Sequence, residues 1–191
     1  ERLRRDGDDL ALDCDGRTTA AEAAVLAERF ERFHLLWLDE PTAETNHEAL
    51  RKISGRTVTP LGWGRNVTDN ARFQDLLRMQ VVDVLRFDMA LHGISYARRA
   101  AALAEAYYTA VAPFARGGPL GTAAALHLAA STPNFFALDV PFAADERDRR
   151  MRRDLLSGAD LETATDGSLA LPTGPGLGVE IDEGALRRYA A

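Results

Sequence analysis

Short apolar runs alternate along the chain with longer segments whose apolar residues recur at helical spacing. The apolar runs lie at residues 10–15, 35–41, 57–64, 81–88, 108–114 and 135–140. They carry few polar residues inside, which is typical of parallel strands that are covered on both faces. Segments 19–33 and 95–108 have the helical pattern, with Thr18 or Thr19 and Ser95 as suitable N-caps. This alternation predicts βαβ units and a parallel sheet, that is, an α/β fold.

Charged residues mark five of the six predicted strand ends. The end positions, at intervals of 23 to 26 residues, are Asp13, Asp39, Arg65, Asp88, Phe114 and Asp139. Charged side chains at the carboxyl ends of successive parallel strands are typical of the active site of a (β/α)8 barrel. An open doubly wound sheet is the alternative, but it would bind a ligand mainly at one switch point. The sequence after the first run also lacks a glycine-rich phosphate loop.

A complete barrel has eight strand–helix units, and this sequence shows about six of them. We therefore expect residues 1–141 to form an incomplete (β/α) barrel that carries the strand-end site. Residues 142–191 should form a C-terminal return segment with a short helix, in which the charged run 145–154 is a solvated face. Two leading units are expected upstream of this sequence, because six units alone would leave two exposed sheet edges.

The composition argues against several classes of function. The 191 residues have a net charge of -6 and a pI of about 5.3, which disfavours nucleic acid as a partner. Apolar runs stay well short of the roughly 20 residues that cross a bilayer, so we expect no membrane partner. A single cysteine, Cys14, excludes an internal disulfide and fits a reducing cytoplasm, where we expect the protein to reside. Alternation with Asp13 and Asp15 should point Cys14 toward the helix layer.

The motifs at the strand ends resemble the mandelate racemase/muconate lactonizing enzyme branch of the enolase superfamily, especially its acid-sugar (galactonate-type) dehydratases. They cover almost the whole chain in order: LALDCDGRTTAAEA, LLWLDEP, TPLGWGRNVT, VVDVLRFDMALHGISYARRAAALAEAY, VAPF, GTAAALHLAASTPNFF and LPTGPGLGVEIDE. The resemblance implies a (β/α)7β barrel with an N-terminal α+β capping domain. The capping domain and the first barrel strands would then lie outside this sequence, and residues 142–191 would pack on the barrel and on the capping domain. We also expect a small sugar-acid-like carboxylate as ligand and a homo-oligomer.

The same resemblance implies a specific reaction with Mg²⁺ as cofactor. Three carboxylates on consecutive strands hold the ion, which binds the substrate carboxylate; a base then removes the α-proton, and an acid expels the β-hydroxyl as water. A hard divalent ion prefers oxygen ligands and stabilises the developing oxyanion. By this resemblance Asp13 and Asp39 fall on the first two metal ligands, with Asp39 in place of the usual glutamate, and Arg65 falls on the third.

The catalytic positions also depart from the pattern of these dehydratases. Asp88 matches the partner of a catalytic histidine, and Phe114, which cannot carry a proton, takes the place of that histidine. Asp15 stands where the general acid is usual, and His92 lies near the barrel mouth in place of a glycine. The catalytic candidates are therefore Asp15, Asp88 and His92, each of which has a structural alternative.

Two interpretations of Arg65 are open. The guanidinium either binds a substrate carboxylate in place of the metal, with Trp63 and Asp139 as further binding candidates, or forms a structural ion pair with Asp13 and Asp39. Both predict that Mg²⁺ binds weakly or not at all, since the site changes by two charge units. Each unit is worth on the order of 4 kcal/mol at ~4 Å and an effective dielectric near 20.

The sequence thus predicts an enolase-superfamily protein that resembles the acid-sugar dehydratases and has a divergent site. As an enzyme it would be a dehydratase-like lyase or a racemase-type member with altered activity. The alternative is a catalytically inactive relative that binds a carboxylate or serves in assembly. A base on the upstream strands would favour the enzyme.

Overall fold

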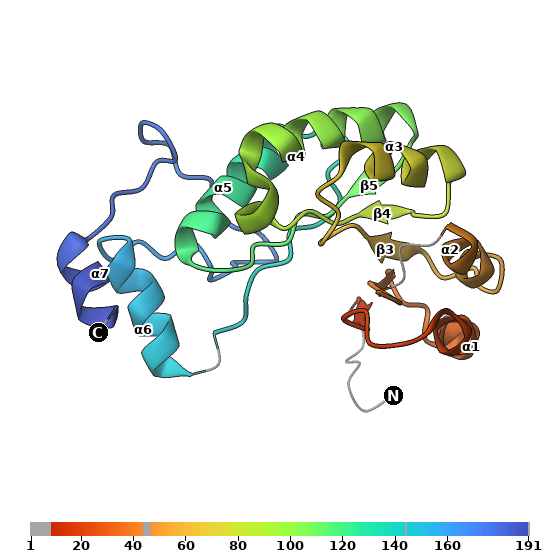
Figure 1. The fold of residues 1–191 in the computed structure, drawn as a ribbon. Helices are drawn as coiled ribbons and strands as arrows, with labels where there is room; N and C mark the ends of the chain where they lie inside the picture. Colours follow the sequence, from red (N-terminus) through yellow and green to blue (C-terminus); the bar gives the residue numbers. More distant parts are fainter. Residues whose placement is uncertain (1–8, 44–46, 144, 191) are drawn as a thin grey trace.

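The computed structural model describes residues 9–43, 47–143 and 145–190. Five parallel strands form one sheet in chain order (Figure 1). They are β1 (Leu12–Asp13), β2 (Leu38–Asp39), β3 (Leu61–Trp63), β4 (Val84–Leu85) and β5 (Ala110–Val111). The predicted parallel α/β sheet with strands in sequential order is confirmed.

The strands are shorter than the apolar runs that predict them. Pro60 directly precedes β3 and Pro113 lies two residues after β5, and proline has no N–H to donate to a ladder. Beyond Pro113 the pairing resumes as the isolated parallel bridge between Asp88 and Phe114. The sixth predicted run is joined in the same way, because Phe135 bridges to Val111 and Asp139 bridges to Phe114.

Helices α1 to α5 accompany the curving sheet along its outer side (Figure 1). They are α1 (Ala20–Phe30) with the 3-10 turn η1 (Glu31–Phe33), α2 (His47–Ser54), α3 (Asn70–Met79), α4 (Met89–Ala106) and α5 (Pro119–Ala130). Thr19 caps α1 as predicted: its hydroxyl accepts the N–H of Glu22, whose carboxylate accepts the N–H of Thr19.

Helix α4 begins earlier than the predicted cap at Ser95. Asp88 is the N-cap, because its Oδ1 accepts the backbone N–H of Ala90 at 2.9 Å. Gly93 then interrupts the helical geometry with φ 69° and ψ 164°, a conformation that glycine adopts without steric cost. The prediction of Ser95 as the first cap is therefore wrong, since the carboxylate at the end of the strand caps a first helical turn before the break.

The apolar core lies between the sheet and the helices. Its larger cluster packs Phe73 and Leu77 of α3 against Phe87 and the alanine face of α4. A smaller cluster packs the alanines of α1 against β2 and β3. Cys14 lies at the edge of this second cluster, so it faces the helix layer as predicted.

The C-terminal residues form α6 (Glu146–Leu155) and α7 (Glu183–Tyr189), which lie together at the end of the molecule away from β1 (Figure 1). The predicted charged run becomes α6, and none of the described residues of this helix is buried. Arg152 of α6 nevertheless holds Glu162, and Glu162 accepts a hydrogen bond from Thr122 of α5 at 2.5 Å.

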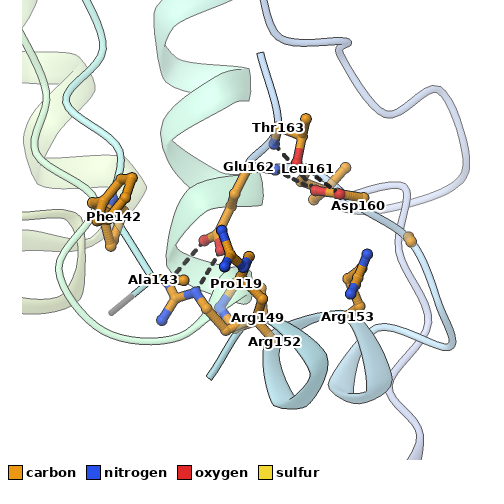
Figure 2. Close-up of a pocket in the computed structure, with 12 residues that line it drawn as sticks. Pro119, Phe142, Ala143, Arg149, Arg152, Arg153, Asp160, Leu161, Glu162 and Thr163 are labelled. Atoms are coloured by element: carbon orange, nitrogen blue, oxygen red, sulfur yellow. Dashed lines mark hydrogen bonds and ion pairs between the residues drawn. The ribbon is translucent and has the colours of Figure 1, made fainter. Parts of the chain in front are cut away.

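A pocket of about 270 Å³ opens between α6, the start of α5 and the loop at residues 159–163 (Figure 2).

None of the described helices is long and apolar enough to cross a membrane. The domain boundary at residues 141/142 stays a prediction.

Candidate functional site

The predicted strand-end residues meet along one edge of the sheet. Asp13 of β1 is in register with Asp39 of β2, and Asp39 is in register with Gly62 of β3. Farther along the sheet, Phe114 bridges to Asp88 on one side and to Asp139 on the other. The carboxyl ends of the parallel strands thus bring together the residues that the sequence intervals select.

Arg65, directly beyond β3, is buried and paired with Asp13. Only 3% of Arg65 is exposed. Its Nη1 donates to Asp13 Oδ2 at 2.9 Å and its Nη2 donates to Asp13 Oδ1 at 2.7 Å, which is the bidentate arrangement that suits a guanidinium and a carboxylate. The Nε lies 3.9 Å from Asp39 Oδ2 and has no hydrogen-bond partner among the described residues. The structural ion pair with Asp13 and Asp39 that the sequence left open is therefore present, with hydrogen bonds to Asp13 and a longer contact to Asp39.

Glu40 fixes the turn that carries Arg65. Its buried carboxylate accepts the backbone N–H groups of Gly64 and Arg65, both at 2.8 Å to Oε1. Gly64 has φ 125°, and an added Cβ would meet the carbonyl oxygen of Arg86 at 3.0 Å. The second glycine of the GWG motif is thus required for the sharp turn that sends the guanidinium back over the sheet.

A second buried arginine, Arg86, was missed by the sequence reasoning. It follows β4, is 1% exposed, and its Nε donates to both carboxylate oxygens of Asp39 at 3.0 Å. Its Nη2 donates to Asp139 at 2.6 Å and its Nη1 donates to the carbonyl of Ala112 at 2.7 Å. The signal was present, because Arg86 lies two residues before Asp88 inside an apolar run and so shares its face of the strand.

Gly62 makes room for this second pair. A Cβ at this position would lie 2.6 Å from Asp39 Oδ1 and 2.5 Å from Trp37 Cδ1. The Asp39 carboxylate can therefore extend over the backbone of β3 toward Arg86 only because residue 62 has no side chain.

The electrostatics of the site follow from burial and from these pairs. Although burial opposes its charge, Asp39, Asp13 and Glu40 together raise the pKa of Arg65 above its ordinary value. Burial raises the pKa of Asp39, and Arg86 and Arg65 oppose this shift. Burial also raises the pKa of Glu40, against the two backbone N–H groups that it accepts. The charges of the buried carboxylates and guanidinium groups are thus stabilised mainly by one another and not by solvent.

Phe114 lies among three guanidinium groups. The Cζ atoms of Arg65, Arg116 and Arg86 lie 5.3, 5.5 and 5.9 Å from the centre of its ring. The Nε of Arg116 is also 3.5 Å from Asp88 Oδ2, and the Arg116 side chain is 52% exposed. Since the other oxygen of Asp88 caps α4, both Asp88 oxygens already have partners.

Of the remaining sequence candidates, Asp15 lies at the site, with Oδ1 3.9 Å from Arg65 Nη2, whereas His92 and Trp63 are engaged elsewhere. The ring nitrogens of His92 are both occupied by backbone carbonyl oxygens, Nδ1 by that of Asp88 at 2.9 Å and Nε2 by that of Val67 at 2.8 Å. Trp63 is buried in the core and its indole N–H donates to the carbonyl of Thr42. Asp15 is half-exposed and pairs with Arg17 at 3.0 Å. The catalytic and binding roles of these residues stay predictions.

The Mg²⁺ site implied by the resemblance does not fit these residues. Both oxygens of Asp13 accept from Arg65, and both oxygens of Asp39 accept from Arg86. Within the described ranges, no group of three or more His, Cys, Asp or Glu side chains is placed to hold a metal ion. The two carboxylates face cations that the protein itself supplies.

Comparison with known proteins identifies relatives of the whole described fold. The family model described as "Enolase C-terminal domain-like" matches residues 1–185. A D-galactonate dehydratase family member of Streptomyces bingchenggensis is 34% identical over 94% of this chain and 43% of its own length. The D-xylonate dehydratase of Haloferax volcanii is 31% identical over 95% of this chain and 43% of its own length.

A solved structure agrees with these sequence relatives. The mandelate racemase/muconate lactonizing enzyme-like protein from Rubrobacter xylanophilus superposes with a TM-score of 0.83 at 34% identity, over 94% of this chain and 45% of its own. The chain spans less than half of the length of each of these proteins.

A Gly62→Ala substitution tests the packing of the Asp39–Arg86 pair. The added Cβ would collide with Asp39 and Trp37, so we expect the free energy of unfolding to fall by about 1–3 kcal/mol. Urea denaturation measures this, with Gly118→Ala as the control, because no atom lies within 4 Å of a Cβ added there and its φ of -85° suits an alanine. Equal stability of wild type and Gly62→Ala would contradict the described packing.

The reactivity of Cys14 tests the charge of its surroundings. Burial, then Asp13 and Asp39, raise the pKa of the Cys14 thiol from 9.0 to about 11. The thiolate is the reactive form, so at pH 8 it should make up about 0.1% of the thiol instead of roughly 10%. Iodoacetamide labelling of native protein is followed by mass spectrometry of the Cys14 peptide. The labelling rate should keep rising with pH and reach half of its maximum near pH 11. A labelling rate that levels off by about pH 9 would contradict the raised pKa of Cys14.

Proposed function

Because this chain belongs to the enolase C-terminal domain-like family, we propose that it forms the barrel part of a dehydratase-like protein that binds small sugar-acid-type carboxylates without Mg²⁺. The relatives named as D-xylonate and D-galactonate dehydratases support the class of ligand. The two arginine–carboxylate pairs support the absence of a metal requirement.

The pairing of Asp13 with Arg65 carries this proposal. A divalent ion at the ends of β1 to β3 would need the oxygens of Asp13, and the Arg65 guanidinium holds both of them. The guanidinium belongs to the protein chain, so the negative charge of Asp13 is neutralised at any Mg²⁺ concentration. Binding of a ligand at the strand ends then depends on protein side chains alone.

Arg116 is the cation placed to meet a carboxylate ligand. It is half-exposed at the strand ends beside Phe114, and its Nε contact with Asp88, at 3.5 Å, is longer than the Arg65 and Arg86 bonds. A ligand carboxylate can approach Arg116 from solvent, whereas Arg65 and Arg86 are enclosed. Asp139, whose side chain is 39% exposed, can accept hydrogen bonds from ligand hydroxyl groups.

The same geometry argues against the dehydration reaction of the relatives. Phe114 cannot carry a proton, and the Asp88 oxygens are engaged by the cap of α4 and by Arg116. Both ring nitrogens of His92 lie on backbone carbonyls. We therefore assign ligand binding, rather than abstraction of an α-proton, to this part of the protein.

A second candidate is a metal-independent lyase. The half-exposed carboxylate of Asp15 at the end of β1 favours it, because that group can reach a ligand as a general acid. A base for this reaction would have to come from outside the described strands.

Calorimetry with the full-length protein tests the proposed function. D-Xylonate, D-galactonate and D-gluconate are titrated in EDTA and again in Mg²⁺, and at least one should bind with the same affinity in both. Arg116→Met should weaken that binding about tenfold or more, because a charged hydrogen bond is lost. Arg98→Met, which changes an exposed arginine on α4, is the matched control.

Two results would count against the proposal: binding that requires Mg²⁺, or none of the three acids binding at all. Exchange of the α-proton in deuterated buffer, followed by NMR for any acid that binds, decides between the two candidates. Exchange would favour the lyase.

A further inference from the structure

The strand ends carry two arginine–carboxylate pairs that connect strands in the same way, although Arg65 binds Asp13 through both Nη atoms and Arg86 binds Asp39 through Nε alone. Arg65, after β3, reaches back over β2 to Asp13 of β1. Arg86, after β4, reaches back over β3 to Asp39 of β2. Each guanidinium therefore crosses one strand and takes both oxygens of one carboxylate, and together the two arginines carry the charge of one divalent cation.

Arg86 is anchored independently of Arg65. Its three nitrogens donate to Asp39, Asp139 and the carbonyl of Ala112. Arg65 makes no hydrogen bond with any of these groups, and its closest approach to Asp39 is the 3.9 Å contact of Nε. Two rings also flank the guanidinium, with Cζ 5.3 Å from the Trp37 ring centre and 5.9 Å from that of Phe114. Removal of Arg65 should therefore leave Arg86 on Asp39.

We infer that Arg86 is a second determinant of metal exclusion, and that it keeps a divalent cation off Asp39 even when Arg65 is replaced by a carboxylate. A metal ion that uses Asp39 as a ligand would lie within a few ångströms of the Arg86 charge, in a site that excludes water. Restoring a glutamate at position 65 is then insufficient, because Asp39 stays bound. The inference rests on the proposed metal-free function and goes beyond it, because that function depends on the Arg65–Asp13 pair, whereas here the Arg86–Asp39 pair excludes the ion without Arg65.

The test compares Mn²⁺ binding by four forms of the full-length protein. The free Mn²⁺ signal in electron paramagnetic resonance is measured for wild type, Arg65→Glu, Arg65→Glu/Arg86→Gln and Arg65→Glu/Arg86→Lys. The glutamine keeps a donor for Ala112 without the charge, and the lysine is the matched control that keeps the charge. Circular dichroism and urea denaturation establish that each form is folded.

The expected order follows from charge alone. Wild type, the single variant and the lysine double variant should leave Mn²⁺ in solution. The glutamine double variant should bind it at least about 100-fold more tightly than Arg65→Glu does. Tight binding by Arg65→Glu alone, or equal binding by the glutamine and lysine double variants, would overturn the inference.

A further measurement keeps the test decisive should the double variants fail to fold. In Arg65→Glu, the side-chain ¹⁵Nε–H signal of Arg86 should not move when MgCl₂ is added, because Arg86 stays on Asp39. A shifted or lost signal would show displacement by the metal and would overturn the inference. Tight Mn²⁺ binding by wild type would instead contradict the proposed function, so the two failures are distinguishable.

Discussion

The site depends on the burial of two guanidinium groups at the carboxyl ends of the strands. A charge taken out of water is costly unless it is paired and hydrogen-bonded, so Arg65 and Arg86 require carboxylates at those positions. Asp13 and Asp39 supply them, and Gly62 and Gly64 provide the space and the turn that let the groups meet. The two glycines and the arginine of the GWGR motif are thus all required for the two arginine–carboxylate pairs.

The network also explains why one substitution would not return the site to a metal centre. Arg65 neutralises Asp13, but its Nε stays 3.9 Å from Asp39 and makes no hydrogen bond with a described residue. Asp39 is buried, and its charge is compensated chiefly by Arg86, which also holds Asp139. Each carboxylate has its own hydrogen-bonded cation, and the two pairs are coupled only through the 3.9 Å approach of Arg65 Nε to Asp39. Both pairs therefore contribute to the present chemistry of the site.

The sequence predicted which residues lie at the strand ends better than it predicted the side chains with which those residues pair. Regular intervals and strand polarity placed Asp13, Asp39 and Asp139 on one edge, because parallel pairing repeats at each crossover. The regular interval selects one residue near the end of each run and so passes over Arg86, although residues two apart share a strand face. The early start of α4 was missed as well, although its signal is local: Asp88 is a favourable N-cap residue that accepts the N–H of Ala90, and Gly93 permits the break that follows.

The central claim is that protein guanidinium groups, and not a metal ion, occupy the space between the strand-end carboxylates. Crystals of the full-length wild-type protein grown in MnCl₂, with anomalous data collected at the manganese edge, test it directly. The account predicts no anomalous peak between Asp13 and Asp39, with Arg65 and Arg86 on these carboxylates. A manganese peak coordinated by both aspartates, with either arginine turned away, would contradict it.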